Sequence, residues 1–239
     1  MNTTFLSIII PCFNEKKSLL RLIAKIKKIK NIKKQIILVD DGSNDGTTEI
    51  IKKKLINKID KIIFHKKNQG KGSAIKSAKK YIKGNFVIIQ DADLEYYPTD
   101  YHKLLNKLKN KNLKVVYGSR VLGRTESLNF LSIKNFAKNF RIMGNYFLTF
   151  ISNFINNQSL TDVHTCYKMF DKKIFLSLNI QEKGFSFCPE VTTKIAKLSY
   201  PIAEVPIKYN GREIKDGKKI RLKDAFIAIY TILKYRYFD

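Results

Sequence analysis

The chain has 239 residues, with 46 Lys and Arg against 20 Asp and Glu, which gives a formal net charge of +26. Hydrophobic residues make up 44% of the chain and aromatic residues 12%, enough to fill a core, so an intrinsically disordered chain is excluded. The three cysteines, Cys12, Cys166 and Cys188, form no CxxC pair, which argues against a structural zinc site and a disulfide framework. A reducing compartment fits these cysteines best.

The excess of basic residues has two readings. A surface this basic attracts polyanions, such as nucleic acid, acidic lipid headgroups or a phosphorylated substrate. Much of the Lys occurs alongside Ile and Asn, a bias that AT-rich codon usage alone would produce. The basic and aromatic residues form no RNP, KH or zinc pattern, so no specific nucleic-acid partner is expected.

Short apolar runs alternate with helical patterns up to about residue 120. This alternation is typical of βαβ units around a mostly parallel sheet, and we expect an α/β fold with helices flanking a central sheet. Strands are expected at residues 5–10, 35–39, 61–64, 85–90 and 114–117. Apolar residues at helical spacing predict helices around residues 19–29, 74–82 and 104–108.

The pattern changes in the second half. A long helix that mixes aromatic and basic residues is expected at 132–156, and a second one at 223–238. Between them we expect a short strand at 165–170, a helix near 189–198 and an extended stretch at 202–209. No linker rich in Gly, Pro or Ser and no internal repeat is present, so residues 1–239 are predicted to form one domain. Several Asn and Gln interrupt the least charged stretch, and neither a membrane-spanning helix nor a signal peptide is expected.

One predicted strand, 85–90, runs directly into Asp91-Ala92-Asp93-Leu94-Glu95. If the backbone stays extended, the three carboxylates project to one side, at the strand end where α/β proteins bind ligands. Clustered carboxylates need a neutralising cation, and Mg²⁺ or Mn²⁺ shared with substrate phosphates is the usual solution. We therefore predict metal ligands here; the alternative is a solvated acidic loop or a helix cap.

A second predicted strand, 35–39, ends in Asp40 and Asp41, followed by a turn rich in Gly, Ser and Asn. Capping of the next helix accounts for the acid later in this turn. Asp40 and Asp41 remain, and either could accept hydrogen bonds from a base or a ribose. The segment 68–72, Asn-Gln-Gly-Lys-Gly, precedes the next helix; backbone amides at a helix start favour an anion, but such a glycine pattern is more often only a turn.

Four segments, in this order and spacing, resemble the family 2 inverting glycosyltransferases of GT-A fold. They are SIIIPCFNE (7–15), VDDGSNDGT (39–47), NQGKG (68–72) and QDADLE (90–95). The later segments VYGSR (116–120), LTDVHTCYK (160–168) and GFSFCPE (184–190) are similar to the dolichol-phosphate mannose synthase branch and its bacterial polyprenyl-phosphate relatives. The resemblance implies an enzyme that moves a hexose from a UDP- or GDP-sugar to a polyprenyl phosphate, using Mg²⁺ or Mn²⁺.

The resemblance also implies roles for single residues in the donor half, residues 1–120. The nucleotide pocket would be lined by Pro11, Phe13, Glu15 and Asp41, and by Asp91-Ala92-Asp93. Phe13 stands where these enzymes usually have Tyr. Asp91 and Asp93 would hold the metal and the donor diphosphate, with Glu95 as a candidate further ligand.

The acceptor half, residues 121–239 together with Arg120, is implied to bind phosphate. Arg120, Arg212 and Lys218 would meet phosphate oxygens of donor and acceptor, and Asp162 would lie near the acceptor. Catalysis is expected to rest on Asp93, Asp162 and Arg120. A polyprenyl phosphate is largely ionised at pH 7, so Asp162 would only orient it. A glycan hydroxyl in cell-surface polysaccharide synthesis, the alternative acceptor, needs a base, and Asp162 is the first candidate.

The two helical segments at 132–156 and 223–238 mix aromatic residues with Lys and Arg, as an in-plane interfacial helix does. An amphipathic helix packed on the core is the alternative. Since a polyprenyl acceptor resides in the bilayer, we expect a cytoplasmic enzyme attached peripherally to the inner face of the cytoplasmic membrane.

Overall fold

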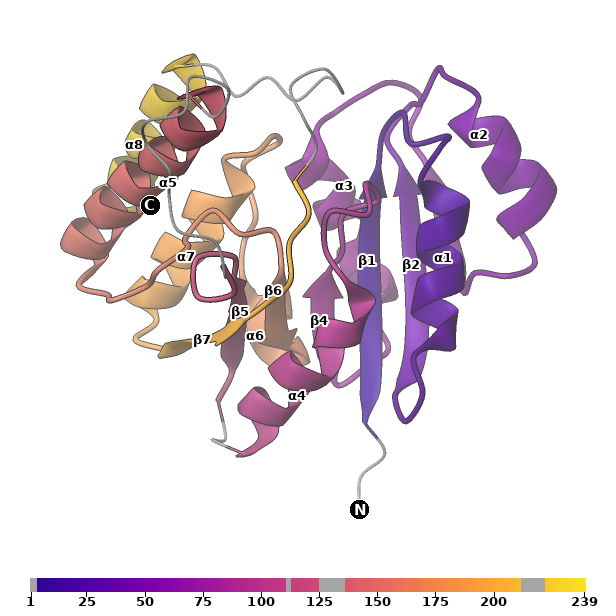
Figure 1. The fold of residues 1–239 in the computed structure, drawn as a ribbon, viewed down its shortest axis with the longest axis horizontal. Coiled ribbons are helices and arrows are strands. Elements are labelled where there is room, and N and C mark those ends of the chain that lie inside the picture. The colour runs from indigo at the N-terminus through magenta and orange to yellow at the C-terminus, as the bar shows by residue number, and fades with distance from the viewer. Residues whose placement is uncertain (1–3, 111–112, 125–135, 212–221) are drawn as a thin grey trace.

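A computed structural model describes residues 4–110, 113–124, 136–211 and 222–239 (Figure 1). Seven strands form one sheet in the order β3-β2-β1-β4-β6-β5-β7. Their bounds are β1 Phe5–Cys12, β2 Lys33–Asp40, β3 Lys61–Phe64, β4 Phe86–Ile89, β5 Val115–Ser119, β6 Lys168–Asp171 and β7 Ile202–Pro206. Strand β6 is antiparallel to β4 and β5, and the other neighbouring pairs are parallel. The predicted single-domain α/β fold with a mostly parallel sheet is confirmed.

Helices cover both faces of this sheet. They are α1 Leu19–Lys28, α2 Thr47–Ile50 with its π-helical continuation η1 Ile51–Leu55, α3 Lys71–Ala78, α4 Tyr101–Asn110, α5 Phe136–Asn156, α6 Lys172–Ser177, α7 Phe187–Lys197 and α8 Leu222–Tyr237. Short 3₁₀ turns, η2 Lys79–Tyr81 and η3 Pro98–Asp100, follow α3 and precede α4. The predicted helices are present, although residues 132–135 of one of them lie outside the described residues. Sequence periodicity missed α6, a six-residue helix.

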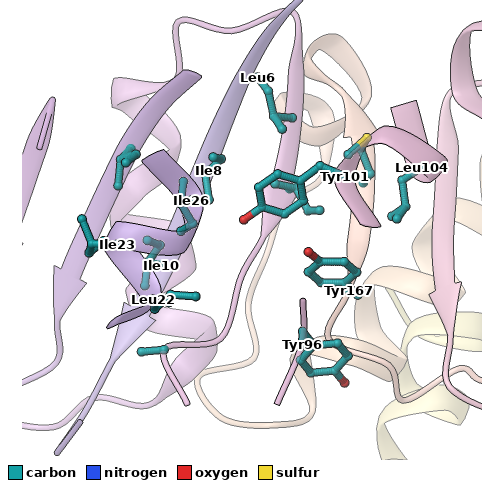
Figure 2. Close-up of a cluster of buried hydrophobic side chains, with 14 of the residues drawn as sticks. Leu6, Ile8, Ile10, Leu22, Ile23, Ile26, Tyr96, Tyr101, Leu104 and Tyr167 are labelled. Atoms are coloured by element: carbon teal, nitrogen blue, oxygen red, sulfur yellow. The ribbon is translucent and has the colours of Figure 1, made fainter. Parts of the chain in front are cut away.

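The central strands are buried on both faces, which is why they read as continuous apolar runs. Side chains alternate along a strand, so Leu6, Ile8 and Ile10 of β1 face α1 and α4 while Ile9 faces the opposite side. Figure 2 shows the first of these two clusters, with the isoleucines and leucines of α1 packed on β1. The second cluster joins the sheet to α3, α6 and α7. Packing in these two clusters fixes the position of β1, β2 and β4, and thereby the position of the polar residues that follow these strands.

Three buried tyrosines form a column beside the end of β4 (Figure 2). Tyr96 stacks on Tyr167 with ring centroids 5.1 Å apart, and Tyr101 stacks on Tyr167 at 5.8 Å. The Tyr101 hydroxyl donates to Oε1 of Gln90 at 2.8 Å, and the Tyr167 hydroxyl donates to the carbonyl oxygen of Tyr97 at 2.9 Å. The stacked rings and the two hydroxyl hydrogen bonds therefore hold the chain segment that follows β4 against the core.

Helices α5 and α8 pack against each other and against α7, at the β7 end of the sheet (Figure 1). Their outer surfaces expose large apolar side chains, and we call this surface the aromatic face. Its members are Met143, Tyr146, Phe147, Phe150 and Phe154 of α5, with Phe226, Ile227, Tyr230, Leu233, Tyr237 and the adjoining Phe238 of the α8 segment. Among the described residues, no helix combines the length and apolar character needed to cross a bilayer.

Candidate active site

The loops after β1 and β2 are tied together at one edge of the sheet. Both strands run parallel with β4, so the carboxyl ends of all three meet there. The backbone N–H of Asn14 donates to Oγ of Ser43 at 2.9 Å, and that of Glu15 donates to Oγ1 of Thr47 at 2.9 Å. Phe13, which precedes Asn14, is 42% exposed. This edge brings together three predicted nucleotide-pocket residues, Pro11, Phe13 and Glu15.

Asp41, the fourth predicted pocket residue, organises the loop after β3. Its side chain is almost fully buried, and Oδ1 accepts from the backbone N–H of Gln69 at 3.0 Å while Oδ2 accepts from that of Gly70 at 2.7 Å. Nδ1 of His65 lies 2.6 Å from Oδ1, and Nε2 of the same ring lies 2.9 Å from Oγ of Ser77. One carboxylate thus fixes the loop that leads into α3.

Asp40 is accounted for by its own turn. Its carboxylate accepts from the backbone N–H of Ser43 at 3.2 Å and from the Thr48 hydroxyl. The side chain is buried. Asp40 therefore stabilises the turn after β2, as Asp41 stabilises the loop after β3.

The chain turns immediately after β4. Leu94 has a φ of 66°, and the backbone N–H of Glu95 donates to Oδ1 of Asp93 at 3.1 Å, which closes the turn. The backbone is not extended through this segment, because Leu94 adopts the left-handed conformation, so the condition under which the three carboxylates would project to one side is not met. Ala92 is buried and anchors the turn in the core.

Asp91 is paired with Lys71, the first residue of α3. Nζ of Lys71 donates to Oδ1 of Asp91, and the two side chains are 10% and 17% exposed. Burial alone lowers the pKa of Lys71, but the Asp91 charge overrides this and raises it, so the ammonium stays charged. Lys71 was not among the predicted site residues. Its only sequence signal was the NQGKG segment before a helix.

Glu95 connects this turn to the far half of the sheet. Its side chain is buried, and Oε2 accepts from the Tyr209 hydroxyl at 2.6 Å, while its carbonyl oxygen accepts from the N–H of Asn210 at 2.9 Å. The Tyr209 ring in turn lies against the Arg120 guanidinium, 5.2 Å from its centroid. A lone Tyr in an extended segment carries no sequence signal, and Tyr209 was missed.

These contacts bear on the predicted metal site. Within the described residues, no three His, Cys, Asp or Glu side chains are grouped so that they could hold an ion. Glu95 is instead engaged by Tyr209, so the structure does not bring all three predicted ligands together. Asp91 and Asp93 still fit a hard divalent cation, because Mg²⁺-type sites commonly use one or two carboxylates and leave the other positions to substrate phosphates and water. The Lys71 ammonium, which pairs with Asp91, already places one positive charge next to these carboxylates.

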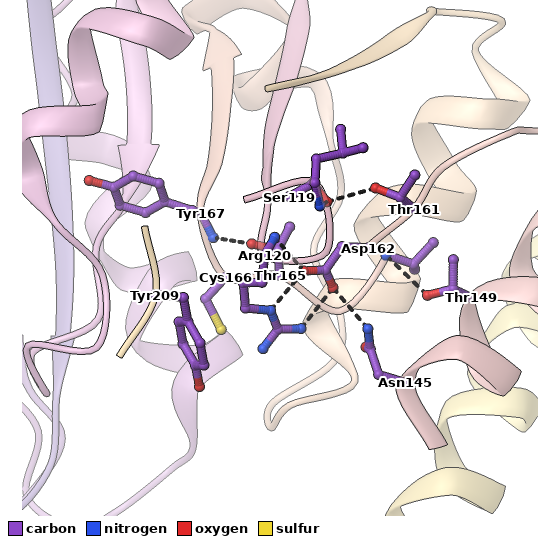
Figure 3. Close-up of polar contacts among 12 residues, drawn as sticks. Ser119, Arg120, Asn145, Thr149, Thr161, Asp162, Thr165, Cys166, Tyr167 and Tyr209 are labelled. Carbon is purple, nitrogen blue, oxygen red and sulfur yellow. Dashed lines mark hydrogen bonds and ion pairs between the residues drawn. The ribbon is translucent and has the colours of Figure 1, made fainter. Parts of the chain in front are cut away.

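Arg120 and Asp162 form a two-pronged ion pair in which the Asp162 side chain is fully buried and the Arg120 side chain is 21% exposed (Figure 3). Nε and Nη2 of Arg120 donate to the two carboxylate oxygens of Asp162, each at 2.7 Å, and the Arg120 backbone N–H donates at 3.0 Å. Nδ2 of Asn145 on α5 adds a bond at 3.2 Å. Residues from the end of β5, from α5 and from the segment before β6 therefore meet at one carboxylate.

The electrostatics of Asp162 follow from this geometry. Complete burial would raise its pKa, but the Arg120 charge and the hydrogen bonds from Arg120 and Asn145 outweigh burial and hold the pKa below its ordinary value. The carboxylate is ionised and both oxygens accept hydrogen bonds. Such a group orients its neighbours and has little tendency to take up a proton.

The family follows from a direct comparison. A family model described as glycosyl transferase family 2 matches residues 7–178. The chain belongs to this family. A dolichyl-phosphate beta-glucosyltransferase of Dictyostelium discoideum is 28% identical over 92% of this chain and 70% of its own length. A dolichyl-phosphate beta-glucosyltransferase of Trichomonas vaginalis is 26% identical over 99% of this chain and 74% of its own.

Solved structures agree on the fold of this glycosyltransferase. Glucosyl-3-phosphoglycerate synthase from Mycobacterium tuberculosis in complex with UDP superposes with a TM-score of 0.72 at 14% identity, covering 98% of this chain and 80% of that one. The same enzyme with Mn²⁺, UDP and phosphoglyceric acid gives a TM-score of 0.72 at 14% identity, covering 100% and 80%. The predicted GT-A fold is confirmed.

Two predicted phosphate-binding residues of the glycosyltransferase, Arg212 and Lys218, lie outside the described residues. Arg120 is the member of that predicted set which the structure describes. The geometry adds Lys71 and Tyr209 as candidate site residues, since each contacts a residue that the sequence had singled out.

Asp41→Asn is expected to lower the free energy of unfolding of the glycosyltransferase by about 1–3 kcal/mol and to weaken nucleotide binding. An amide has one acceptor oxygen, so it cannot accept from both backbone N–H groups and from His65 together. Urea unfolding and titration with UDP and GDP measure the two effects. Ser77→Ala leaves the bonds to the carboxylate intact and serves as the control. Wild-type stability and affinity in Asp41→Asn would refute this organising role.

Proposed function

We propose that this glycosyltransferase transfers a hexose from a UDP- or GDP-sugar to a polyprenyl phosphate at a membrane surface, with inversion at the anomeric carbon. The observation that carries the proposal is the double role of α5. Asn145 of this helix contributes to the Arg120–Asp162 centre, while the same helix presents Phe147, Phe150 and Phe154 to solvent. The phosphate of one acceptor would then lie near the Asn145 end of α5, and its apolar chain would lie along the exposed phenylalanines of the same helix.

The similar proteins support both substrates of the proposal. Two relatives are named as dolichyl-phosphate beta-glucosyltransferases, which supports a polyprenyl phosphate as acceptor. Complexes of the M. tuberculosis synthase with UDP, and with Mn²⁺ or Mg²⁺, support a nucleotide-sugar donor and a divalent cation. In this proposal residues 1–120 bind the donor and residues 121–239 the acceptor, with Arg120 at their junction.

Departure of the nucleoside diphosphate needs positive charge at the edge of the sheet. The bond between the anomeric carbon and the diphosphate oxygen breaks, and the leaving group keeps the electron pair. Lys71, charged beside Asp91, and Arg120, held by Asp162, are fixed cations that stabilise this developing charge. A Mg²⁺ or Mn²⁺ ion held by Asp91 and Asp93 would supply further charge to the leaving diphosphate.

Attack by the acceptor needs no strong base. The second pKa of a phosphate monoester is about 6, so its oxygen is already anionic at pH 7 and forms the new bond to the anomeric carbon directly. This chemistry matches the state of Asp162, which is ion-paired and ionised. Nε and Nη2 of Arg120 donate hydrogen bonds to Asp162, whereas Nη1 makes no hydrogen bond to that carboxylate. We assign Nη1 to the acceptor phosphate.

The aromatic face is the proposed membrane contact. Phe150 is 66% exposed and Phe154 83% exposed, and the described side chains of α5 from residue 142 onward carry no charge. Aromatic side chains of this kind settle at the boundary between headgroups and acyl chains. The net charge of +26 adds attraction to acidic lipids.

Phe150→Ser/Phe154→Ser is expected to reduce binding to vesicles of equal parts phosphatidylcholine and phosphatidylglycerol by at least about tenfold, since each lost phenyl ring removes apolar burial. Vesicle sedimentation measures the bound fraction. The matched control, Ile56→Ser/Phe64→Ser, removes exposed apolar groups toward the β3 end of the sheet and should bind as wild type. Wild-type binding in both double variants would point to charge alone, and equal loss in both would mean that no single apolar surface is used; either result would contradict the assignment of the aromatic face.

The deciding experiment is a transfer assay. Purified full-length protein is incubated with radiolabelled UDP- and GDP-hexoses, Mn²⁺ or Mg²⁺, and dolichyl or undecaprenyl phosphate in detergent, followed by organic extraction. Label in the organic phase that depends on the lipid phosphate is the expected result. A panel that gives no lipid-soluble label, while a glycan acceptor becomes labelled in the aqueous phase, would replace the lipid phosphate by a hydroxyl acceptor.

A further inference from the structure

The chain segment that carries Asp162, residues 160–163, lies between α5 and β6 and outside regular secondary structure. Its backbone hydrogen bonds therefore come mostly from side chains of the surrounding elements. At the start of the segment, Asn153 of α5 bonds both the N–H and the carbonyl oxygen of Leu160, at 3.0 and 2.7 Å. Backbone polar groups inside a protein need such partners, so the side chains that supply them set the position of Asp162.

Glu204 of β7 supplies the partners in the middle of this segment. Oε1 accepts from the backbone N–H of Asp162 at 3.0 Å, and Oε2 accepts from the backbone N–H of Thr161 at 2.7 Å. Oε2 also accepts from the Thr161 hydroxyl at 2.9 Å. Both oxygens act as acceptors, as in an ionised carboxylate, and hydrogen bonds to a charged acceptor are the stronger kind. One side chain thus fixes two consecutive N–H groups beside the Arg120–Asp162 pair.

The Thr161 hydroxyl extends this contact to the other member of the pair. Its oxygen lies 2.6 Å from Oγ of the buried Ser119, the residue before Arg120 (Figure 3). Because Thr161 donates its own proton to Glu204, Ser119 is the donor in this contact. Oγ of Ser119 in turn accepts from the backbone N–H of Leu122 at 3.1 Å. Glu204 is therefore connected to residues on both sides of Arg120.

The strand that carries Glu204 does not need this carboxylate. β7 is otherwise uncharged, lies at the end of the sheet order, and is held by parallel pairing with β5, in which Glu204 stands opposite Tyr117. Glu204 is partly buried, and burial penalises a charge. The three hydrogen bonds from Thr161 and Asp162 offset that penalty. The side chain is thus accounted for by the segment it binds.

We propose that Glu204 is a positioning residue for the Arg120–Asp162 centre, holding the Thr161–Asp162 backbone so that Asp162 aligns Arg120 for the acceptor phosphate. The choice of acceptor in this inference rests on the proposed function. Glu204 bonds the backbone of Asp162 and acts on Arg120 only through it and through the Thr161 hydroxyl. When these N–H groups lose their partner, the segment moves and Asp162 moves with it. Small displacements of positioned groups are costly to a reaction.

Kinetics of the full-length Glu204→Gln variant test this role. The amide has one acceptor oxygen, so it can serve Thr161 or Asp162 but presents its NH₂ group to the N–H of the other. We expect the KM for polyprenyl phosphate to rise by about tenfold or more, as the loss of a hydrogen bond to a charged group predicts. The Kd for UDP and GDP should stay within about twofold of wild type. An unchanged acceptor KM, or an equal change in nucleotide affinity, would overturn the proposal.

Glu190→Gln is the matched comparison, because Glu190 makes the same pair of bonds in another loop. Its two oxygens accept from the backbone N–H groups of Gln181 and Glu182 at 2.6 and 2.9 Å, and this loop meets the start of α3. Glu190 also pairs with Lys194, so its loss of stability should be the larger. The acceptor KM should nevertheless stay within about twofold. A rise equal to that of Glu204→Gln would mean general destabilisation and refute a positioning role.

Glu204→Asp keeps the proposal testable if Glu204→Gln does not fold. It retains the charge and both acceptor oxygens on a shorter side chain, so either the bonds lengthen or the segment moves toward β7. Both changes displace Asp162, and the acceptor KM should rise by about threefold or more. A folded Glu204→Asp enzyme with the wild-type acceptor KM would count against the role of Glu204.

An unfolding cycle that needs no substrate separates this inference from the proposed function. The shift of the urea midpoint caused by Glu204→Gln should be at least halved in the Asp162→Asn background, because the pair that Glu204 supports is already broken there. Additive shifts would contradict the positioning role for any acceptor. Coupled shifts in an enzyme that labels no lipid phosphate would keep the positioning role and reject the acceptor.

Discussion

Asp162→Asn is expected to lower the transfer rate by about 100-fold or more and the free energy of unfolding by about 3–5 kcal/mol. The substitution removes the charge of the fully buried Asp162, and the Arg120 guanidinium, whose side chain is only 21% exposed, is left without the partner that neutralises it. It also replaces an acceptor by an NH₂ group that faces the Arg120 donors. Arg120 would turn away from the place assigned to the acceptor phosphate.

Urea unfolding and the lipid-phosphate transfer assay measure these two losses. Asp171→Asn is the matched control, because Asp171 faces Lys114 across 4.0 Å in a more exposed pair, and such pairs contribute about 0–1 kcal/mol. Asn145→Ala removes a single bond to Asp162 and should fall between the two. A stable Asp162→Asn enzyme that transfers at the wild-type rate would remove the Arg120–Asp162 pair from the mechanism.

The same pair predicts a pH dependence of stability. Because the folded-state pKa of Asp162 is depressed, its contribution is fully present above the unfolded value of about 3.9 and is lost as the pH falls through the folded pKa. The difference in unfolding free energy between wild type and Asp162→Asn should therefore be constant near neutrality and shrink below about pH 4. A difference that stays constant into strong acid would mean that the carboxylate does not interact with Arg120.

The sequence predicted most of the fold because the buried strands carry an unambiguous signal. Apolar β-branched runs located the strands of the first half to within a few residues, including β3 at Lys61–Phe64. The direction of β6 could not be read, since a four-residue strand has the same pattern whether it runs parallel or antiparallel to its neighbours. Helix α6 was missed because it is too short for a repeating apolar pattern.

The sequence offered the acids of the candidate site as candidates, but it did not indicate which side chains they contact. Asp91 and Asp93 were identified because they follow a buried strand. The partners are distant in sequence: Lys71 and Asp91 are 20 residues apart, and Glu95 and Tyr209 are 114 apart. Which side chains meet depends on the left-handed turn at Leu94 and on loop packing, and neither has a local pattern.

Comparison of Asp93→Asn with Asp91→Asn separates catalysis from folding at this turn. Both variants are expected to lose about 100-fold or more in transfer, since each removes a carboxylate charge from the proposed donor diphosphate site. They should differ in stability. Asp91→Asn leaves the buried Lys71 ammonium without its partner and should cost about 3–5 kcal/mol, whereas an amide oxygen at position 93 can still accept the bond from Glu95 N–H.

Donor binding with and without Mn²⁺ distinguishes the reasons for the two losses. If Asp93 holds the cation, Asp93→Asn binds UDP or GDP normally in the absence of Mn²⁺ and loses the increase in affinity that Mn²⁺ gives the wild type. Lys71→Met/Asp91→Asn removes both charges of the buried pair, so it should recover stability relative to Asp91→Asn without recovering transfer. Full Mn²⁺-dependent affinity and transfer in Asp93→Asn would exclude Asp93 as a ligand and leave Asp91, with Lys71 beside it, as the residue on which the donor diphosphate site depends.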